Sequence, residues 1–405
     1  MTVSGEKTDG RHERRCFEDA GFPVVVIKLS TIPGNGSCPL SYPLSFTAKE
    51  HAQWQRKDRL DDLDNECLTE LRVTNPQKDR KSIVDAKGGL FHESSSWILE
   101  NEEYKQWLTG SENTLFWVKG DPGKGKTMLL AGIITELERP SPDSVFYFFC
   151  QTTEPRLRTA TNVLRGLLWS LVRTRAYMIH HVRKDYKKEG KGVFSDSNAW
   201  QTLCDILIAI LEDGDLVQDC VFVVDALDEC TTDRDQLLKF IGRASTSYKA
   251  KWIVSSRNWF EIEKRMDCIQ KKARLQLEMN AAAISDAVKK YITRRIDRLD
   301  AENNYRESTR KEIQKHLLAN ADDTFLWVSL VCDELGKPDV MSHHIETVLN
   351  SFPAGLEKLY EKRVEKINGS RERDLRKAAL GVVGVAYRPL TLAELGSSDS
   401  MLEQA

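Results

Sequence analysis

Eight residues, GDPGKGKT at 120–127, constrain the fold of this 405-residue chain more than any other feature. They match the pattern G-x-x-x-x-G-K-[ST], in which backbone N–H groups curl around nucleotide phosphates and glycines permit the close approach and positive φ angles. An apolar run at 115–118 precedes the motif, and the helix-like stretch MLLAGIITELE follows it. The alternative is a glycine-rich turn with a surface lysine. The strand before and the helix after favour a phosphate-binding P-loop.

The whole loop is the candidate nucleotide site. Lys126 is expected to reach the β and γ phosphates of ATP or GTP, and Thr127 is expected to place its hydroxyl on Mg²⁺. The helix that begins there points unpaired N–H groups and its positive dipole end at the anion. The pattern leaves ATP and GTP both open, because base selectivity comes from contacts to the purine. The candidate nucleotide-binding residues are Gly120, Asp121, Pro122, Gly123, Lys124, Gly125, Lys126 and Thr127.

A second segment, VFVVDALDEC at 221–230, is an apolar run that ends in acidic residues. Consecutive apolar residues without alternation predict a parallel strand buried on both faces. An ionised Asp225 at the end of such a strand is unfavourable unless it meets a cation, and nucleotide-bound Mg²⁺ is the obvious one. Asp228 or Glu229 could then orient or deprotonate the water that attacks the γ phosphate. The structural alternative is an acidic helix N-terminus after a core strand.

A third segment, KWIVSSRNW at 251–259, again runs from apolar to polar residues. Its carboxyl end is therefore expected at the same edge of the sheet. Arg257 could stabilise charge on the γ phosphate there and report whether that phosphate is present. The alternative is a surface arginine in a salt bridge.

The alternation of strand and helix patterns predicts the architecture. Strands are expected at about 115–119, 144–150, 220–225, 251–256 and 273–278. A helix such as 162–174 would cover the sheet with its apolar face. This pattern is typical of an α/β fold with a parallel sheet in three αβα layers and ligands at the carboxyl ends of the strands.

The predicted units follow from these patterns. Residues 87–279 form the nucleotide-binding domain, and a helical linker at 49–86 precedes it. Residues 1–48 are turn-rich and are expected to be poorly ordered or the remnant of an N-terminal domain. From 280 to 405 the pattern is helical, and its aromatic residues are predicted to be core; these are Phe325, Trp327 and Tyr360.

Composition favours a soluble cytoplasmic protein, because 40% of residues are hydrophobic, 30% are charged and no apolar run reaches the length of a membrane span. The N-terminus lacks the pattern of a secretory signal. Nine cysteines show no zinc spacing, so we expect reduced thiols, with Cys150 and Cys220 on buried strands. Lys plus Arg (59) nearly balances Asp plus Glu (61), which gives no reason to expect a nucleic acid partner.

The motifs together resemble NACHT-domain signal-transduction NTPases of the STAND class, in particular the NLR-like proteins of filamentous fungi linked to heterokaryon incompatibility. Three pieces carry the resemblance: GGLFHESSSWILENEEYKQWL, WVKGDPGKGKTMLLAGIITEL, and VFVVDALDEC with the small Ala226 after Asp225. It continues in the family's order to about residue 396 through LRGLLWSLV, DDTFLWVSLVCDEL, FPAGLEKLYEKRVEKI and YRPLTLAEL. The last piece, at 387–395, resembles the start of a winged-helix segment.

The resemblance implies a nucleotide-driven switch in cell-death or defence signalling. Such proteins rest closed with a nucleoside diphosphate, open on exchange for a triphosphate that they hydrolyse slowly, and self-associate or join related NACHT proteins. It gives the P-loop residues the phosphate role, Asp225 the Mg²⁺ role, Asp228 or Glu229 the hydrolytic role, and Arg257 the sensor role. Family members usually also carry an effector domain and a repeat array, and no WD40 or ankyrin period is found in this sequence.

Three other functions stay open at this point. The first is a generic P-loop ATPase or GTPase, although the sequence has no N-K-x-D guanine motif and no L-S-G-G-Q transporter signature. The second is a non-catalytic scaffold, or a truncated decoy, that binds nucleotide as a structural ligand. The third is a small-molecule kinase, whose arginine-rich lid is not evident.

Overall fold

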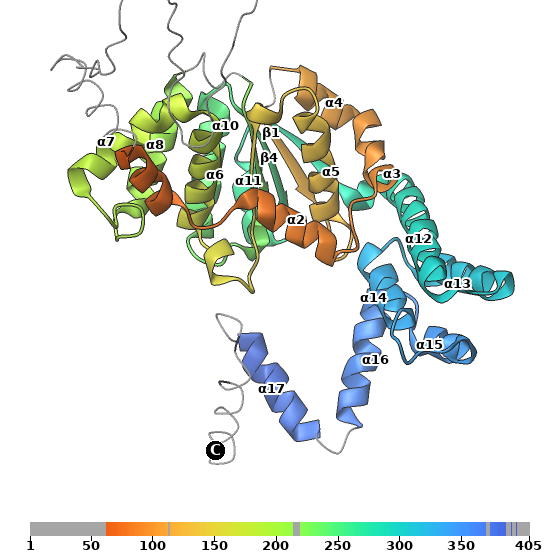
Figure 1. Ribbon diagram of the computed structural model, residues 1–405. Coiled ribbons are helices and arrows are strands. Elements are labelled where there is room, and N and C mark those ends of the chain that lie inside the picture. The colour runs from red at the N-terminus through yellow and green to blue at the C-terminus, as the bar shows by residue number, and fades with distance from the viewer. Residues whose placement is uncertain are drawn as a thin grey trace, which may run out of the picture. The chain divides into compact units, whose positions relative to one another are not determined.

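Within the described residues, five parallel strands form one sheet in the order β2-β3-β4-β1-β5 (Figure 1). The strands are β1 (Leu115–Lys119), β2 (Val145–Phe149), β3 (Val221–Asp225), β4 (Lys251–Ser256) and β5 (Lys272–Gln276). Each predicted strand is present, with small shifts at its ends. β5 ends before residue 278 because Leu277–Asn280 form a 3₁₀ turn.

The register of the sheet brings the three sequence motifs to one edge. Lys119 at the end of β1 pairs with Ser256 of β4, and Phe149 at the end of β2 pairs with Asp225 of β3. Because all five strands are parallel, their carboxyl ends share this edge. The P-loop, the acidic cluster and Arg257 follow directly from it.

The structure describes residues 62–111, 114–213, 219–369 and 373–385, with the single residues 390 and 394. The expectations for residues 1–48, and nearly all of the winged-helix expectation at 387–395, lie outside this part of the chain. The described residues 62–71 are helical and lie within the predicted helical linker. The helices around the sheet are α2 (Pro76–Ala86), α3 (His92–Ser95), α4 (Glu102–Thr109), α5 (Lys126–Glu138), α6 (Ala160–Thr174), α7 (Ile179–Glu189), α8 (Ala199–Glu212), α10 (Arg234–Ser247) and α11 (Phe260–Asp267).

The strands are apolar on both faces, and each face packs against helices. On one face Trp117, Phe148 and Val224 join residues of α6, α8 and α10 in one core. On the other face Val118 and Val223 join residues of α4, α5 and the helical region in a second core. Alternate side chains of a strand point to opposite faces, so an unbroken apolar strand fills two cores. The predicted parallel three-layer αβα fold is therefore confirmed.

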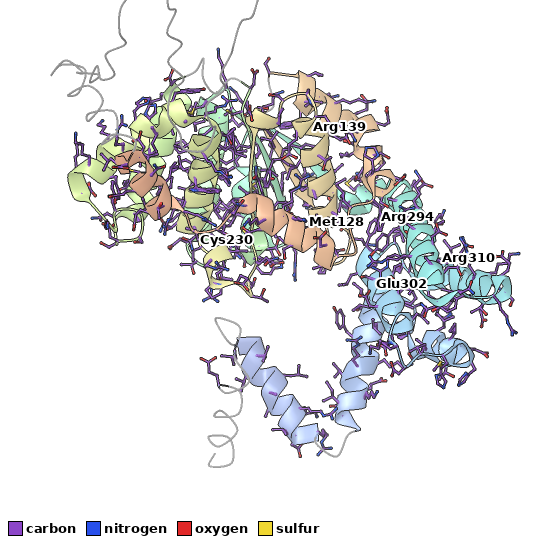
Figure 2. The ribbon with its side chains drawn as sticks, viewed as in Figure 1. Met128, Arg139, Cys230, Arg294, Glu302 and Arg310 are labelled. Carbon is purple, nitrogen blue, oxygen red and sulfur yellow. The ribbon has the colours of Figure 1, made fainter. Side chains whose placement is uncertain are left out.

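The remainder of the described chain is helical, as predicted. It contains α12 (Ala281–Asn303), α13 (Glu307–Asn320), α14 (Phe325–Leu335), α15 (Ile345–Ser351), α16 (Leu356–Asn368) and α17 (Arg373–Val385). Arg310 of α13, labelled in Figure 2, pairs with Asp297 and Asp300 and ties α13 to α12. Trp327 is fully buried and its indole N–H donates to the Pro353 carbonyl at 2.8 Å, so its predicted core position is confirmed.

Two smaller expectations are refined. Cys150 and Cys220 are both buried, but Cys150 follows β2 and Cys220 precedes β3, so neither belongs to a strand. No helix among the described residues combines the length and the apolar character that crossing a bilayer requires.

Candidate nucleotide site

A cavity of about 460 Å³ opens at the carboxyl edge of the sheet. Its volume lies in the usual range for small-molecule sites. The P-loop residues 122–127, with Asp228, Glu229 and Arg257, form the polar wall. Aromatic residues form another wall; these are Phe91, Trp97, Tyr291, Phe325 and Tyr360. Met128 also lines the cavity and marks the start of α5 in Figure 2.

The P-loop has the backbone that its glycines predict. Gly123 and Gly125 have φ angles of 79° and 84°, in the left-handed region that favours glycine. α5 begins at Lys126, so its free N–H groups face the cavity. The Lys126 ammonium donates to the carbonyls of Gly120 at 2.5 Å and Asp121 at 2.9 Å. Burial lowers the pKa of Lys126, while the charges of Asp228 and Asp225 raise it.

Gly120 and Asp121 lie behind the loop and not on the cavity wall. The Asp121 N–H donates to a carboxylate oxygen of Glu278 at 2.6 Å. Its own carboxylate accepts from the Asn258 amide at 2.9 Å. These two contacts anchor the loop from the side away from the cavity, and sequence reasoning missed both partners because they come from distant loops.

Asp225 is buried at the end of β3, with an exposed fraction of 2%. The Ser255 hydroxyl donates to its Oδ1 at 2.5 Å and accepts from the Ala226 N–H at 2.8 Å. Burial raises the pKa of Asp225, and hydrogen bonds from Ser255 and Thr127 lower it. Sequence reasoning missed Ser255; its position at the polar end of β4 was the available signal.

Thr127 and Asp225, the two predicted metal ligands, are brought into contact. Both present oxygen atoms, which Mg²⁺ prefers. Asp225 has no ion-pair partner among the described residues, so a bound cation would offset the unfavourable burial of its charge. These residues therefore fit a Mg²⁺ ion.

Asp228 and Glu229 differ in their surroundings. Asp228 is buried, and Arg257 holds it through the backbone N–H at 3.0 Å and through Nε at 2.9 Å. Glu229 is half-buried and accepts from the Thr152 N–H at 3.1 Å. Burial raises the pKa of Glu229, which brings a carboxylate closer to the range of a general base. Of the two acids, Glu229 is better suited to accept a proton, and Asp228 to position Arg257.

The segment Asp322–Leu326, which joins α13 to α14, contacts the P-loop directly. Lys124 donates to the Asp322 carbonyl at 3.2 Å, and the Leu326 N–H donates to the Gly123 carbonyl at 3.3 Å. A Cβ on Gly125 would lie 2.8 Å from the Phe325 ring. Sequence reasoning could not predict this contact, because it joins segments about 200 residues apart.

The aromatic wall corrects one prediction. Tyr360 lines the cavity and is half exposed, so its predicted core position is wrong, whereas Phe325 packs against the second core and also lines the cavity. Tyr291 lies 5.6 Å from Phe91 and 5.4 Å from Phe325, measured between ring centroids. Arg294 of α12, labelled in Figure 2, lies over the Phe91 ring at 5.9 Å. The spacing of apolar residues could not distinguish a core position from a position on the cavity wall, because both surroundings are apolar.

The parallel αβα sheet, the P-loop and the acidic end of β3 at the same edge define a P-loop nucleotide-binding protein of the NTPase fold. A family model, Nephrocystin 3, N-terminal, matches residues 93–257. The chain is 46% identical over 336 residues to the vegetative incompatibility protein HET-E-1 of Podospora anserina. This alignment covers 82% of the chain and 25% of the relative, so the chain spans about a quarter of that protein's length.

Among solved structures, the Walker-type ATPase PABY2304 of Pyrococcus abyssi is similar, with a TM-score of 0.42 and 13% identity over 78% of this chain and 89% of that one. The fold class is taken from the sheet and the P-loop themselves and not from this distant match. With the family model and the fungal relative, the motifs place the chain among the NACHT-type, fungal NLR-like proteins.

Proposed function

We propose that this protein is a cytoplasmic nucleotide switch of the NACHT type. It binds ATP or GTP with Mg²⁺, hydrolyses it slowly, and controls self-association in incompatibility or other defence signalling. One observation carries the proposal: the P-loop forms part of the nucleotide cavity and also contacts Asp322–Leu326, the turn and first residues of α14 in the helical region. A change at the phosphates can therefore reach the helical region through a single loop.

The residues divide the chemistry among them. Lys126 and the N–H groups at the start of α5 hold the phosphate oxygens. Thr127 and Asp225 would hold Mg²⁺, which supplies charge neutralisation on the phosphates when it is bound. Glu229 accepts the proton of the attacking water, and Arg257 stabilises the charge that develops on the transferred phosphoryl group.

The contacts of the two cations support slow turnover. Lys126 donates to P-loop carbonyls, and Arg257 pairs with the buried Asp228. Each cation must weaken these bonds to reach a phosphate, so the site is not fully preorganised for the transition state. Slow hydrolysis suits a switch, whose signal lasts as long as the triphosphate.

The test is thermal unfolding with and without Mg²⁺ and ATP, GTP or ADP, together with measurement of phosphate release. A ligand at a hundred times its Kd adds about 2.7 kcal/mol to the free energy of unfolding. A rise in Tm in the wild type that is absent in Lys126→Ala supports the site. Slow phosphate release then supports the switch, and fast release indicates an ordinary NTPase.

Binding without release would favour the non-catalytic scaffold or decoy. No shift with any nucleotide would reject nucleotide binding by this chain. Self-association is measured separately, by light scattering of the wild type with diphosphate and with a non-hydrolysable triphosphate. A mass that does not change between the two nucleotides would reject the switch.

A further inference from the structure

The turn between α2 and α3 presents Lys87 to the nucleotide cavity. α2 ends at Ala86, and Gly88 and Gly89 follow Lys87 with φ angles of 88° and 92°. The Gly89 N–H donates to the Val84 carbonyl at 2.9 Å, which closes the turn onto the end of α2. Two consecutive left-handed residues favour glycine at both positions and reverse the chain sharply beside Lys87.

The turn is fixed from both sides. A Cβ on Gly88 would lie 2.5 Å from the Arg295 guanidinium of α12, so α12 packs closely on this backbone. On the other side, Arg80 of α2 donates to the Ala131 carbonyl at 2.9 Å and to Glu138 at 2.8 Å, both on the P-loop helix α5. The backbone of Lys87 is therefore held in place relative to the P-loop by contacts that do not involve its own side chain.

Four described cationic residues line the cavity: Lys87, Lys124, Lys126 and Arg257. Lys124 donates to Asp322, Lys126 donates to P-loop carbonyls and Arg257 pairs with Asp228. Lys87 is exposed, and among the described residues its ammonium has neither a hydrogen-bond nor an ion-pair partner. It is the cation of this wall that can reach an anion without first leaving another partner.

Lys87 lines the same cavity as the P-loop residues 122–127. The N–H groups at the start of α5 and Lys126 mark where the phosphates would lie in this cavity. A cation on the wall of that cavity, partly screened from solvent, interacts strongly with a polyphosphate.

We propose that Lys87 binds the phosphate chain of the nucleotide, as a ligand supplied by the segment that precedes the sheet. The proposal rests on the proposed function, since it adds a contact to the same site. The contact would also couple α2 and the turn after it to the phosphates. The segment that precedes the sheet would then respond to the bound nucleotide, as the helical region does through Asp322–Leu326.

The test compares Lys87→Gln with Lys81→Gln, an exposed lysine on α2 that does not line the cavity. Binding of the Mg²⁺ complexes of ATP and GTP, and of ADP and GDP, is measured by titration calorimetry. The expected loss for Lys87→Gln is roughly ten- to a hundredfold in triphosphate affinity, as for a lost hydrogen bond to a charged group. Lys81→Gln should bind as the wild type does, and Lys87→Arg should recover much of the affinity.

A second measurement separates binding from folding. Because no described residue forms a hydrogen bond or ion pair with the Lys87 ammonium, the Tm of Lys87→Gln without nucleotide should equal that of the wild type. Its affinity should also depend less on salt than that of the wild type, because one charge contact is gone. If Lys87→Gln binds like the wild type while Lys126→Ala does not, this inference is wrong and the proposed function stands. If the wild type binds no nucleotide, both are wrong.

Discussion

Arg257 holds the Asp228 carboxylate at both oxygens, with its backbone N–H 3.0 Å from Oδ1 and its Nε 2.9 Å from Oδ2. Asp228 is buried, so this ion pair is partly shielded from solvent. The pair links the end of β4 to the turn after β3, and it keeps the guanidinium at the polar wall of the cavity. The two acids that follow Asp225 therefore differ in their surroundings, because Asp228 is held by Arg257 and Glu229 accepts from the Thr152 N–H.

Glu229→Gln should abolish phosphate release and leave nucleotide binding in place. A general base contributes about 10²–10⁴-fold to rate, and glutamine cannot accept the proton. Asp228→Asn is the comparison, because it leaves the Glu229 carboxylate intact while it weakens the hold on Arg257 and removes a negative charge that acts on Lys126. Single-turnover phosphate release with matched nucleotide titrations measures both variants. A greater loss of rate in Asp228→Asn than in Glu229→Gln would reverse the assignment of the two acids.

Asp225→Asn should stabilise the nucleotide-free protein and remove its stabilisation by Mg²⁺ and nucleotide. Because burial raises the pKa of Asp225 above its value in the unfolded chain, the native state binds more protons between the two values. The free energy of unfolding therefore falls as pH rises through that window. Asparagine removes the buried charge and can still accept from Ser255. The expected gain in Tm is about 2–4 °C for each kcal/mol.

Thermal unfolding at neutral pH, with and without Mg²⁺ and nucleotide, measures both effects. A lower Tm for nucleotide-free Asp225→Asn would show that the carboxylate stabilises the fold. A Mg²⁺-dependent shift retained in the variant would remove Asp225 from the metal site.

Ser255→Ala should make Mg²⁺-dependent nucleotide binding more sensitive to acid. Metal binding needs ionised Asp225, so affinity falls as pH falls through its pKa, which burial already raises. Losing the hydroxyl hydrogen bond raises this pKa further, because that bond stabilises the ionised carboxylate. The acid limb of the binding profile should move to higher pH, and Ser255→Thr should restore it.

Ser256→Ala is the matched control for this experiment. Ser256 is equally buried on β4, but its hydroxyl accepts from the Trp117 indole at 3.0 Å, away from Asp225. Ser256→Ala should change stability without moving the acid limb. Equal movement of the limb in both variants would mean that Ser255 acts only through packing.

Gly123→Ala should destabilise the contact between the P-loop and the segment Asp322–Leu326, which joins α13 to α14. Gly123 has a φ of 79°, and an added Cβ would lie 2.8 Å from Thr324 and 2.9 Å from Leu356. We expect a loss of about 1–3 kcal/mol in the free energy of unfolding, from overpacking together with backbone strain. Hydrogen exchange should rise in the amides of the first turn of α14.

Gly190→Ala is the control that measures backbone strain without a steric contact. Gly190 has a similar φ of 78°, and a Cβ there would meet no atom within 4 Å. It should lose only backbone strain, about 1–3 kcal/mol because its ψ of −158° lies in a region that favours glycine, and leave exchange at α14 unchanged. Equal behaviour of the two variants would show that the steric contact with the helical segment contributes nothing.

The local motifs made much of the site predictable. A P-loop is contiguous, so the positive φ angles of Gly123 and Gly125 and the start of α5 at Lys126 follow from eight adjacent residues. The strands before Lys119, Asp225 and Arg257 were predictable because each is an unbroken apolar run. Parallel pairing then places their carboxyl ends at one edge, whatever the details of packing.

Contacts between distant segments were beyond such reasoning. Ser255 on Asp225, Asp322 on Lys124, and the cavity positions of Phe325 and Lys87 depend on how separate elements pack. A serine, a lysine or a phenylalanine has the same appearance in a sequence whether it faces a ligand, a core or solvent.

The sequence by itself determined the fold class, the loop that receives phosphate and the acids at the end of β3. These features depend on the backbone preference of adjacent glycines and on short apolar runs, and both are local in the chain. Only the tertiary structure decided which acid is held by Arg257 at both oxygens, which part of the helical region contacts the loop, and which lysine of the cavity has no partner among the described residues. These properties arise from distances between residues far apart in the chain, and packing alone sets those distances.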